Sequence, residues 1–222
     1  DLQGQEGLLR WTDAFNRDMP YQSLQARLEA VLEQGQWQLT LPQLQLRHPE
    51  LELDAQMQLW LGPKPGMSLL AELRGVKVDQ AQHYFPHRHM PASVIRYLQP
   101  ALISGDIPSA RVLWHGDFAD FPYAGGQGKF QALADIAGAE FAFDVHWPAL
   151  KQLDVELLFD NASMLISSKQ GQLFDLSVGQ GVQVSIPNLF QATDLWVDIQ
   201  TQARAEQVTT LMLASPLSES VG

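Results

Sequence analysis

The sequence contains no cysteine, few basic residues, and no apolar run long enough to cross a membrane as a helix. The absence of cysteine excludes disulfide bonds and thiolate metal sites. Lysine and arginine number 14 against 25 aspartates and glutamates, which gives a formal net charge of −11. Because no cluster of lysine or arginine interrupts this acidic balance, non-specific nucleic-acid binding and electrostatic docking onto anionic lipid headgroups are disfavoured.

Motifs for catalysis and for metal or phosphate binding are also missing. No Gly-x-Ser-x-Gly elbow occurs, and residues 125–129 lack both the spacing and the following helix of a phosphate-binding loop, so they are interpreted as a hairpin turn. The loop carboxylates Asp117 and Asp120 need no catalytic role. The histidines of the middle segment lack the spacing of a helical metal site and are interpreted as solvated loop residues: His83, His87 and His89. We therefore predict that the chain is not an enzyme and holds no metal ion or cofactor.

The composition is typical of a folded protein. Hydrophobic residues make up 45% and charged residues 18% of the 222 residues, which argues against disorder and allows a sizeable core. The sequence begins at Asp1 without a methionine and contains no signal peptide. We therefore expect it to be part of a longer protein whose targeting signals lie elsewhere.

The most informative segment is residues 50–62, in which polar and apolar residues alternate. Successive side chains of a strand point to opposite faces, so the pattern predicts one solvated face and one apolar face. At about 3.3 Å per residue, this strand is roughly twice the usual length. Its apolar positions are Leu51, Leu53, Ala55, Met57, Leu59 and Leu61.

Similar alternation recurs along the chain and predicts strands in residues 36–46, 67–78, 107–118, 130–136, 141–147, 153–159 and 195–199. Pro42 shifts the phase of the first of these, which indicates a bulge or an edge kink. Residues 23–32 fit both a strand and a helical stripe, and the neighbouring strands favour a strand.

Two short helices are predicted, over residues 91–102 and 205–213, the first with Pro91 in its first turn. They are too few to cover the apolar faces of so many strands. Either two sheets close on each other, or one sheet curls and leaves an apolar trough. We predict a mainly β (β-rich α+β) fold, with long antiparallel amphipathic strands in a curved, groove-forming sheet and two short helices.

The order of these elements predicts four segments. Residues 1–78 and 106–203 are expected to form two β-groove segments, joined by a helical connector at residues 79–105. Residues 204–222 are expected to contain a helix and the start of a further module. Strands that run into a helix near Pro100, and again near Pro216, form a weak internal repeat.

A set of short motifs distinguishes the middle of the chain. Tyr97-Leu98 precedes Gly105, Gly116 precedes Phe121-Pro122, Gly128 precedes Phe130, and Trp147-Pro148 follows. Together these motifs, over residues 84–159, resemble the YhdP-type branch of the AsmA-like family of Gram-negative envelope proteins. The flanking residues share general sequence features with that family but no specific motif.

The resemblance implies a periplasmic part of an envelope protein, anchored in the inner membrane by a segment outside this chain. It implies repeating β-groove modules in a very long chain that moves phospholipid between the inner and outer membranes. Such transport would affect outer-membrane lipid homeostasis and the permeability barrier. The expected partners are phospholipid acyl chains, the inner membrane through the anchor, and the outer membrane at the far end. The family supplies no catalytic residues.

The apolar alternation and the resemblance meet in one hypothesis, in which one face of each long strand lines a lipid groove. The predicted lining residues are Leu51, Leu53, Met57, Leu59, Phe141, Phe143, Val145, Leu153, Val155, Leu157, Leu195, Val197 and Ile199. The alternative is a closed β-sandwich that binds envelope proteins, in which the same residues form an ordinary core. A glycan-acting enzyme is disfavoured because acid–base residues do not cluster.

Overall fold

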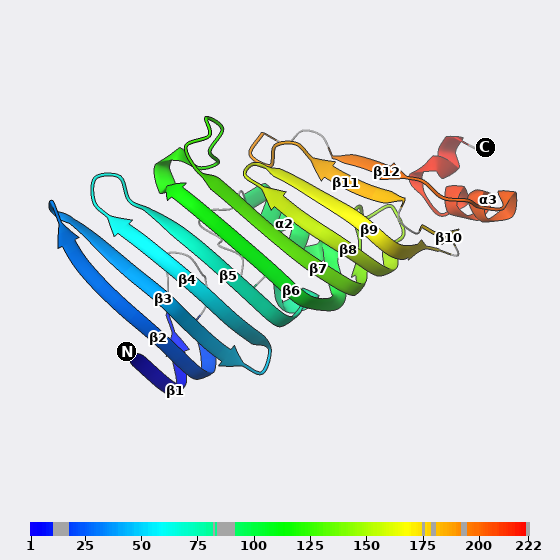
Figure 1. The fold of residues 1–222 in the computed structure, drawn as a ribbon. Helices are drawn as coiled ribbons and strands as arrows, with labels where there is room; N and C mark the ends of the chain where they lie inside the picture. The colour runs from blue at the N-terminus through cyan, green and yellow to red at the C-terminus, as the bar shows by residue number, and fades with distance from the viewer. Residues whose placement is uncertain are drawn as a thin grey trace.

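One large antiparallel sheet dominates the computed structural model, which describes residues 1–10, 18–81, 83, 92–174, 176–178, 181–191 and 195–220. The sheet has 12 strands, which lie side by side in chain order from β1 to β9 and continue with β11 and β12, while β10 pairs with β9 (Figure 1). The strands are β1 (Leu2–Leu9), β2 (Met19–Glu33), β3 (Gln36–His48), β4 (Leu51–Leu61), β5 (Gly66–Lys77), β6 (Leu102–Asp117), β7 (Lys129–Phe141), β8 (Leu150–Asp160), β9 (Ser163–Leu173), β10 (Leu176–Ser177), β11 (Val182–Ile186) and β12 (Trp196–Ile199).

The predicted mainly β fold is confirmed, and so are its two least certain strand features. Residues 23–32 lie within β2, where tight pairing with β3 overrides their helical propensity. The register of β3 against β4 shifts between Leu41 and Leu44. This is the bulge predicted at Pro42, since proline has no N–H to donate to the ladder.

Three α-helices occur in the described part of the chain: α1 (Val78–Ala81), α2 (Ala92–Ala101) and α3 (Ala205–Leu213). The 3₁₀ turns η2 (Phe118–Asp120) and η3 (Pro216–Ser220) accompany them. The bounds of α3 confirm the predicted second helix. The first predicted helix is confirmed as α2, although Pro91 lies outside the described residues and Leu102 already belongs to β6. The single turn of α1 was not predicted. The division into four segments stays a prediction.

Two predicted strand boundaries were wrong. Strand β6 begins at Leu102 rather than at residue 107, directly after α2. Strand β7 ends at Phe141, so residues 143–147 lie in the connection to β8. Asp144 ends the alternation there: its Oδ1 accepts a hydrogen bond from the His146 backbone N–H at 2.7 Å, and its carbonyl oxygen accepts one from the Trp147 N–H at 3.3 Å. Local side-chain bonds of this kind stabilise turns against extended strand.

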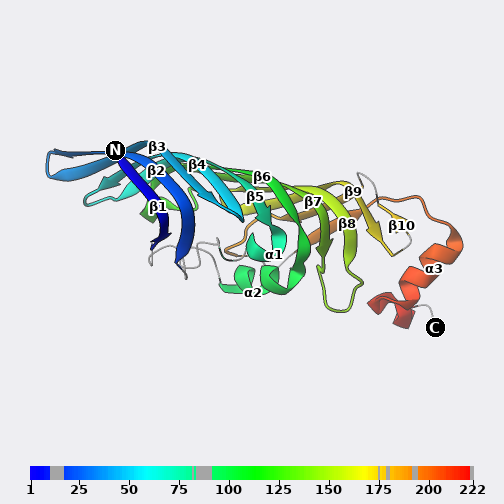
Figure 2. The same ribbon diagram turned by 90° about the horizontal axis from the view of Figure 1, so that it is seen from below.

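The sheet is curved, and α1, α2 and the β7–β8 connection lie on one side of it (Figure 2). The main core lies on that side, where buried residues of β7 to β11 pack together with Val78 of α1 and Ala101 of α2. A second cluster beneath α2 joins Leu98 to Met164 and Ile186. A third, smaller core joins Leu46, Leu51 and Val76 at the ends of β3, β4 and β5. Within the described ranges, no helix is long and apolar enough to span a membrane.

Candidate functional site

The candidate site is one face of the sheet, defined by residues that lie directly opposite each other on neighbouring strands. Directly paired residues share a face, so the register identifies the members of that face. A continuous apolar row runs from β2 to β12 without a charged residue. It consists of Leu24, Leu46, Leu53, Leu73, Ala110, Ala134, Leu157, Ile166, Val184 and Val197.

Parallel rows extend this surface along the strands. The next row is Leu44, Ala55, Ala71, Val112, Ala132, Phe159, Met164 and Ile186, and the row beyond it is Leu41, Met57, Leu69, Trp114 and Phe130. We call the surface formed by these three rows, together with its continuation toward the β2–β3 and β4–β5 turns through Leu39, Leu59, Trp37 and Leu32, the apolar face.

On β2 to β5 the apolar face is buried near Leu46 by the small core at the strand ends, whereas toward the β2–β3 and β4–β5 turns no described residue covers it, and we call this uncovered part the open half. Its central residues, such as Met57 and Leu69, are half-buried by their neighbours on the sheet. Toward the β2–β3 and β4–β5 turns the exposure rises, to 56% for Leu32 and 48% for Trp37. These large apolar side chains therefore contact solvent in the absence of a ligand.

The half of the apolar face on β6 to β11 is covered by α1 and α2. Leu98 and Ala101 of α2 are buried against it. An apolar cavity of about 180 Å³ lies between these helices and the strands. The hydroxyl of Tyr97, also on α2, is buried and has no hydrogen-bond partner among the described residues, and burial raises its pKa.

A cluster of aromatic rings closes the covered half at the η2 end. Trp114 stacks on Phe121 with ring centroids 4.9 Å apart, and the edge of Phe130 meets Trp114 at 5.1 Å. Glycine makes room for the ring of Tyr123, because a Cβ on Gly116 would come within 2.7 Å of it. The cluster thus extends the apolar face around the end of β6 and β7.

Eleven of the thirteen residues predicted to line a groove lie on or next to the sheet, in four places. Met57 and Leu59 lie on the open half, whereas Leu51 and Leu53 belong to or contact the small core at the strand ends. Four residues of β7 and β8 line the cavity: Phe141, Leu153, Val155 and Leu157. Leu195, Val197 and Ile199 lie on or next to the edge strand β12. Their contact with lipid stays a prediction.

Two predicted lining residues lie off the sheet. Phe143 and Val145 belong to the β7–β8 connection rather than to a strand. Phe143 still packs against the main core and lies 5.8 Å from the Trp147 ring, whereas Val145 is 88% exposed. Val145 therefore does not contribute to the apolar face.

Other residues of the apolar face were not among the predicted lining residues. Leu41 and Leu69 sit in alternating stretches and were available from the same pattern. Ala110 and Ala134 were not recognised because alanine contributes little to a hydrophobic pattern, and only the strand register places them in the centre of the face.

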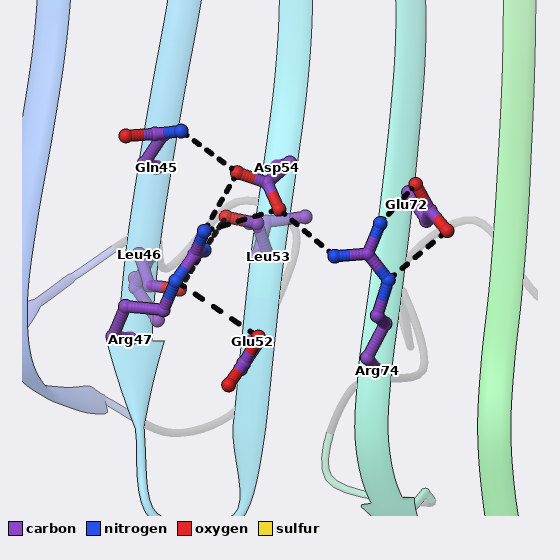
Figure 3. A network of polar contacts seen from close by, with 8 residues as sticks. All are labelled: Gln45, Leu46, Arg47, Glu52, Leu53, Asp54, Glu72 and Arg74. Carbon is purple, nitrogen blue, oxygen red and sulfur yellow. Dashed lines mark hydrogen bonds and ion pairs between the residues drawn. The ribbon is translucent and has the colours of Figure 1, made fainter.

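The opposite, polar face carries a network of ion pairs (Figure 3). Asp54 is its centre: it accepts hydrogen bonds from Arg47 at 2.9 Å and from Gln45 at 3.1 Å, while Arg74 reaches it at 3.5 Å. Arg74 also pairs with Glu72 at 2.6 Å. Exposed pairs of this kind contribute about 0–1 kcal/mol each, so they fix orientation and solubility more than stability.

Two further ion pairs on this face lower carboxylate pKa values. The hydrogen bond from Lys169 to Asp135, at 2.8 Å, holds the pKa of that carboxyl below its usual value. The hydrogen bond from Lys129 to Asp160, at 2.6 Å, acts in the same direction. Within the part of the chain that the structure describes, His, Asp and Glu form no group of three or more suited to a metal ion. His87 and His89 lie outside the described residues.

An open antiparallel sheet with one continuous apolar face, and with its charged side chains on the other face, defines an amphipathic β-groove protein. The chain belongs to the YhdP family, since the family model described as "YhdP protein" matches residues 1–222. The resemblance of the middle motifs to this family is thereby confirmed.

The chain is similar to the intermembrane phospholipid transporter YhdP of Escherichia coli (strain K12). The two are 29% identical over 159 residues, which is 72% of this chain and 12% of that protein. The chain thus spans only a small part of the length of this relative. No solved structure matches the chain.

Proposed function

We propose that this chain is one segment of a periplasmic lipid conduit, and that its apolar face shields phospholipid acyl chains as they move between the inner and outer membranes. The observation that carries the proposal is that a continuous apolar row crosses the sheet from β2 to β12 and that the same face stays exposed at Leu32 and Trp37, toward the β2–β3 turn. Every strand in the described residues belongs to the same sheet. No second sheet among those residues therefore covers this row, as a β-sandwich core would require.

The hydrophobic effect supplies the physical reason for such a surface. Each methylene of an acyl chain exposed to water costs about 0.8 kcal/mol, so a chain of about 16 carbons costs on the order of 10 kcal/mol. A protein that carries acyl chains across an aqueous compartment must replace this exposure with continuous apolar contact. The open half offers such contact over several strands, and no charged side chain interrupts its rows.

The polar face and the net charge fit the same role. The polar face stays in water, and headgroups can remain solvated at the open side of the groove, so no basic patch is required. The inner-membrane anchor and the outer-membrane contact would lie in other parts of the protein. A conduit of this kind supports outer-membrane lipid homeostasis and the permeability barrier without catalytic residues.

Native mass spectrometry of the full-length protein tests the proposal. We expect mass increments equal to phospholipids after gentle extraction, and we expect their loss when organic solvent removes lipid. If the protein is lipid-free under conditions in which a known lipid-binding protein keeps its ligand, the proposal fails and a protein-binding sheet becomes the better explanation.

A further inference from the structure

The cavity beneath α2 differs from the open half because helices cover it. Its floor is made of small residues on the central strands, namely Ala110, Ala132, Ala134 and Ala139. Its roof and walls include Val78 of α1, Leu98 of α2 and Leu102 at the start of β6. Small residues under a helical cover leave a space of about 180 Å³ that no side chain fills.

The chemistry of the lining selects an apolar ligand. Apart from Glu140, every described residue along the cavity has an apolar side chain, and Glu140 forms an ion pair with Lys151 at 3.7 Å. Dry apolar cavities of about 150 Å³ accept benzene, so a space of this size holds about six carbon atoms. It is too small for a headgroup or a complete acyl chain.

The cavity adjoins the open half of the apolar face. Ala110 on its floor lies directly opposite Leu73, and Val112 lies opposite Ala71, so the floor continues onto β5. In the other direction the face is filled by the buried core residues Val178, Val182 and Val184, each 2% exposed. An acyl chain lying across β4 and β5 can therefore place its end in the cavity.

We propose that this cavity is a terminal pocket that binds the last carbons, about six in number, of one acyl chain, while the rest of that chain lies on the open half. The inference rests on the proposed function and deepens it, since it assigns the two halves of the apolar face to two parts of the same ligand. The helix α2 then forms the roof over the end of that chain.

Two photoreactive lipids test this assignment with the full-length protein. Both are phosphatidylcholines in vesicles, one with a diazirine on the terminal carbon of a palmitoyl chain and one with a diazirine next to its carboxyl group. Labelled peptides are identified by mass spectrometry. We expect the terminal probe to label peptides of α2 and β8 around Leu98 and Val155, and the other probe to label β4 and β5.

Two matched variants separate the pocket from the open half. Ala134→Leu fills the floor of the cavity, whereas Ala71→Leu makes the same change on β5 outside it. Each methylene withdrawn from water favours binding by about fourfold, so loss of space for about three carbons should reduce terminal labelling of α2 by tenfold or more. Ala71→Leu should leave that labelling unchanged. Circular dichroism verifies that both variants are folded.

The outcomes separate the pocket from the conduit. Terminal labelling confined to β2 to β5 in the unmodified protein, or labelling of α2 that persists in folded Ala134→Leu, overturns the terminal pocket while leaving the conduit intact. If Ala134→Leu does not fold, the labelling pattern of the unmodified protein alone decides. If neither probe labels any residue of the apolar face, both the pocket and the proposed function fail.

Discussion

A polar pair placed across the open half should block lipid movement without unfolding the sheet. Met57 on β4 and Leu69 on β5 lie directly opposite each other on the apolar face. The double variant Met57→Lys/Leu69→Glu introduces opposite charges that can pair across the strands. Such cross-strand pairs contribute roughly 0.2–1 kcal/mol, which offsets part of the lost apolar contact and keeps the register. The expected result is a folded protein with a polar bar across its apolar face.

The magnitude follows from the width of that bar. Neighbouring strands are about 4.8 Å apart, and an extended acyl chain rises about 1.25 Å per methylene, so a bar over two strands faces about four methylenes of a crossing chain. Keeping four methylenes out of apolar contact costs about 3.2 kcal/mol, which corresponds to a slowing on the order of 200-fold if this step limits transport. A single substitution should have a smaller effect, because a chain can pass beside it.

The assay compares this variant with Gln58→Lys/Ser68→Glu, which places the same charge pair on the same two strands but on the polar face. Transfer of radiolabelled phospholipid from inner to outer membrane is measured in cells that depend on this protein, and thermal unfolding is measured on both purified variants. We expect a large loss of transfer only for the apolar-face pair. Equal transfer by two folded variants would refute the assignment of faces.

Three further predictions concern stability, each measured by denaturant unfolding. Leu46 is 1% exposed, so Leu46→Ala should lower the free energy of unfolding by about 2–5 kcal/mol. Leu32→Ala, on the open half, should lower it by less than about 1 kcal/mol. Similar losses for the two variants would contradict the division into core and open face. Tyr97→Phe should leave stability unchanged or raise it, because the buried hydroxyl has no hydrogen-bond partner among the described residues, and a loss above about 1 kcal/mol would contradict this. The pKa of Asp135 is lowered in the folded protein, so its pairing with Lys169 stabilises the fold fully above about pH 4, and this contribution is lost as the pH falls through the folded pKa. Asp135→Asn should remove this part of the acid dependence of the free energy of unfolding. An unchanged dependence of that free energy on pH would contradict the prediction.

Strand alternation predicted most of the sheet because long amphipathic strands produce a period that little else in a sequence matches. The prediction from alternation was wrong after Phe141, where polar and apolar residues continue to alternate but Asp144 forms a turn. Pro42 was predicted correctly because a missing N–H is a local property that tertiary structure cannot restore. The effect of a single residue such as Pro42 was therefore predicted more reliably than the residue at which a strand ends.

The candidate site depended on contacts that the sequence does not encode locally. The pattern identified which residues face the apolar side, including Met57 and Val155, but not that one half is open and the other covered. That division arises because α2 packs on strands far along the chain, where Leu98 meets Met164 and Ile186. The cavity arises from alanines such as Ala134, which carry little hydrophobic signal in a sequence.

Photo-crosslinking in living cells tests the central claim most directly. A photoreactive amino acid is placed at Met57, on the open half of the apolar face, and in a matched protein at Gln58, the next residue and on the polar face. After irradiation the protein is purified and its adducts are identified by mass spectrometry. The account predicts phospholipid adducts at residue 57 and none at residue 58. Adducts at residue 58 alone, or protein adducts without lipid at residue 57, would contradict it.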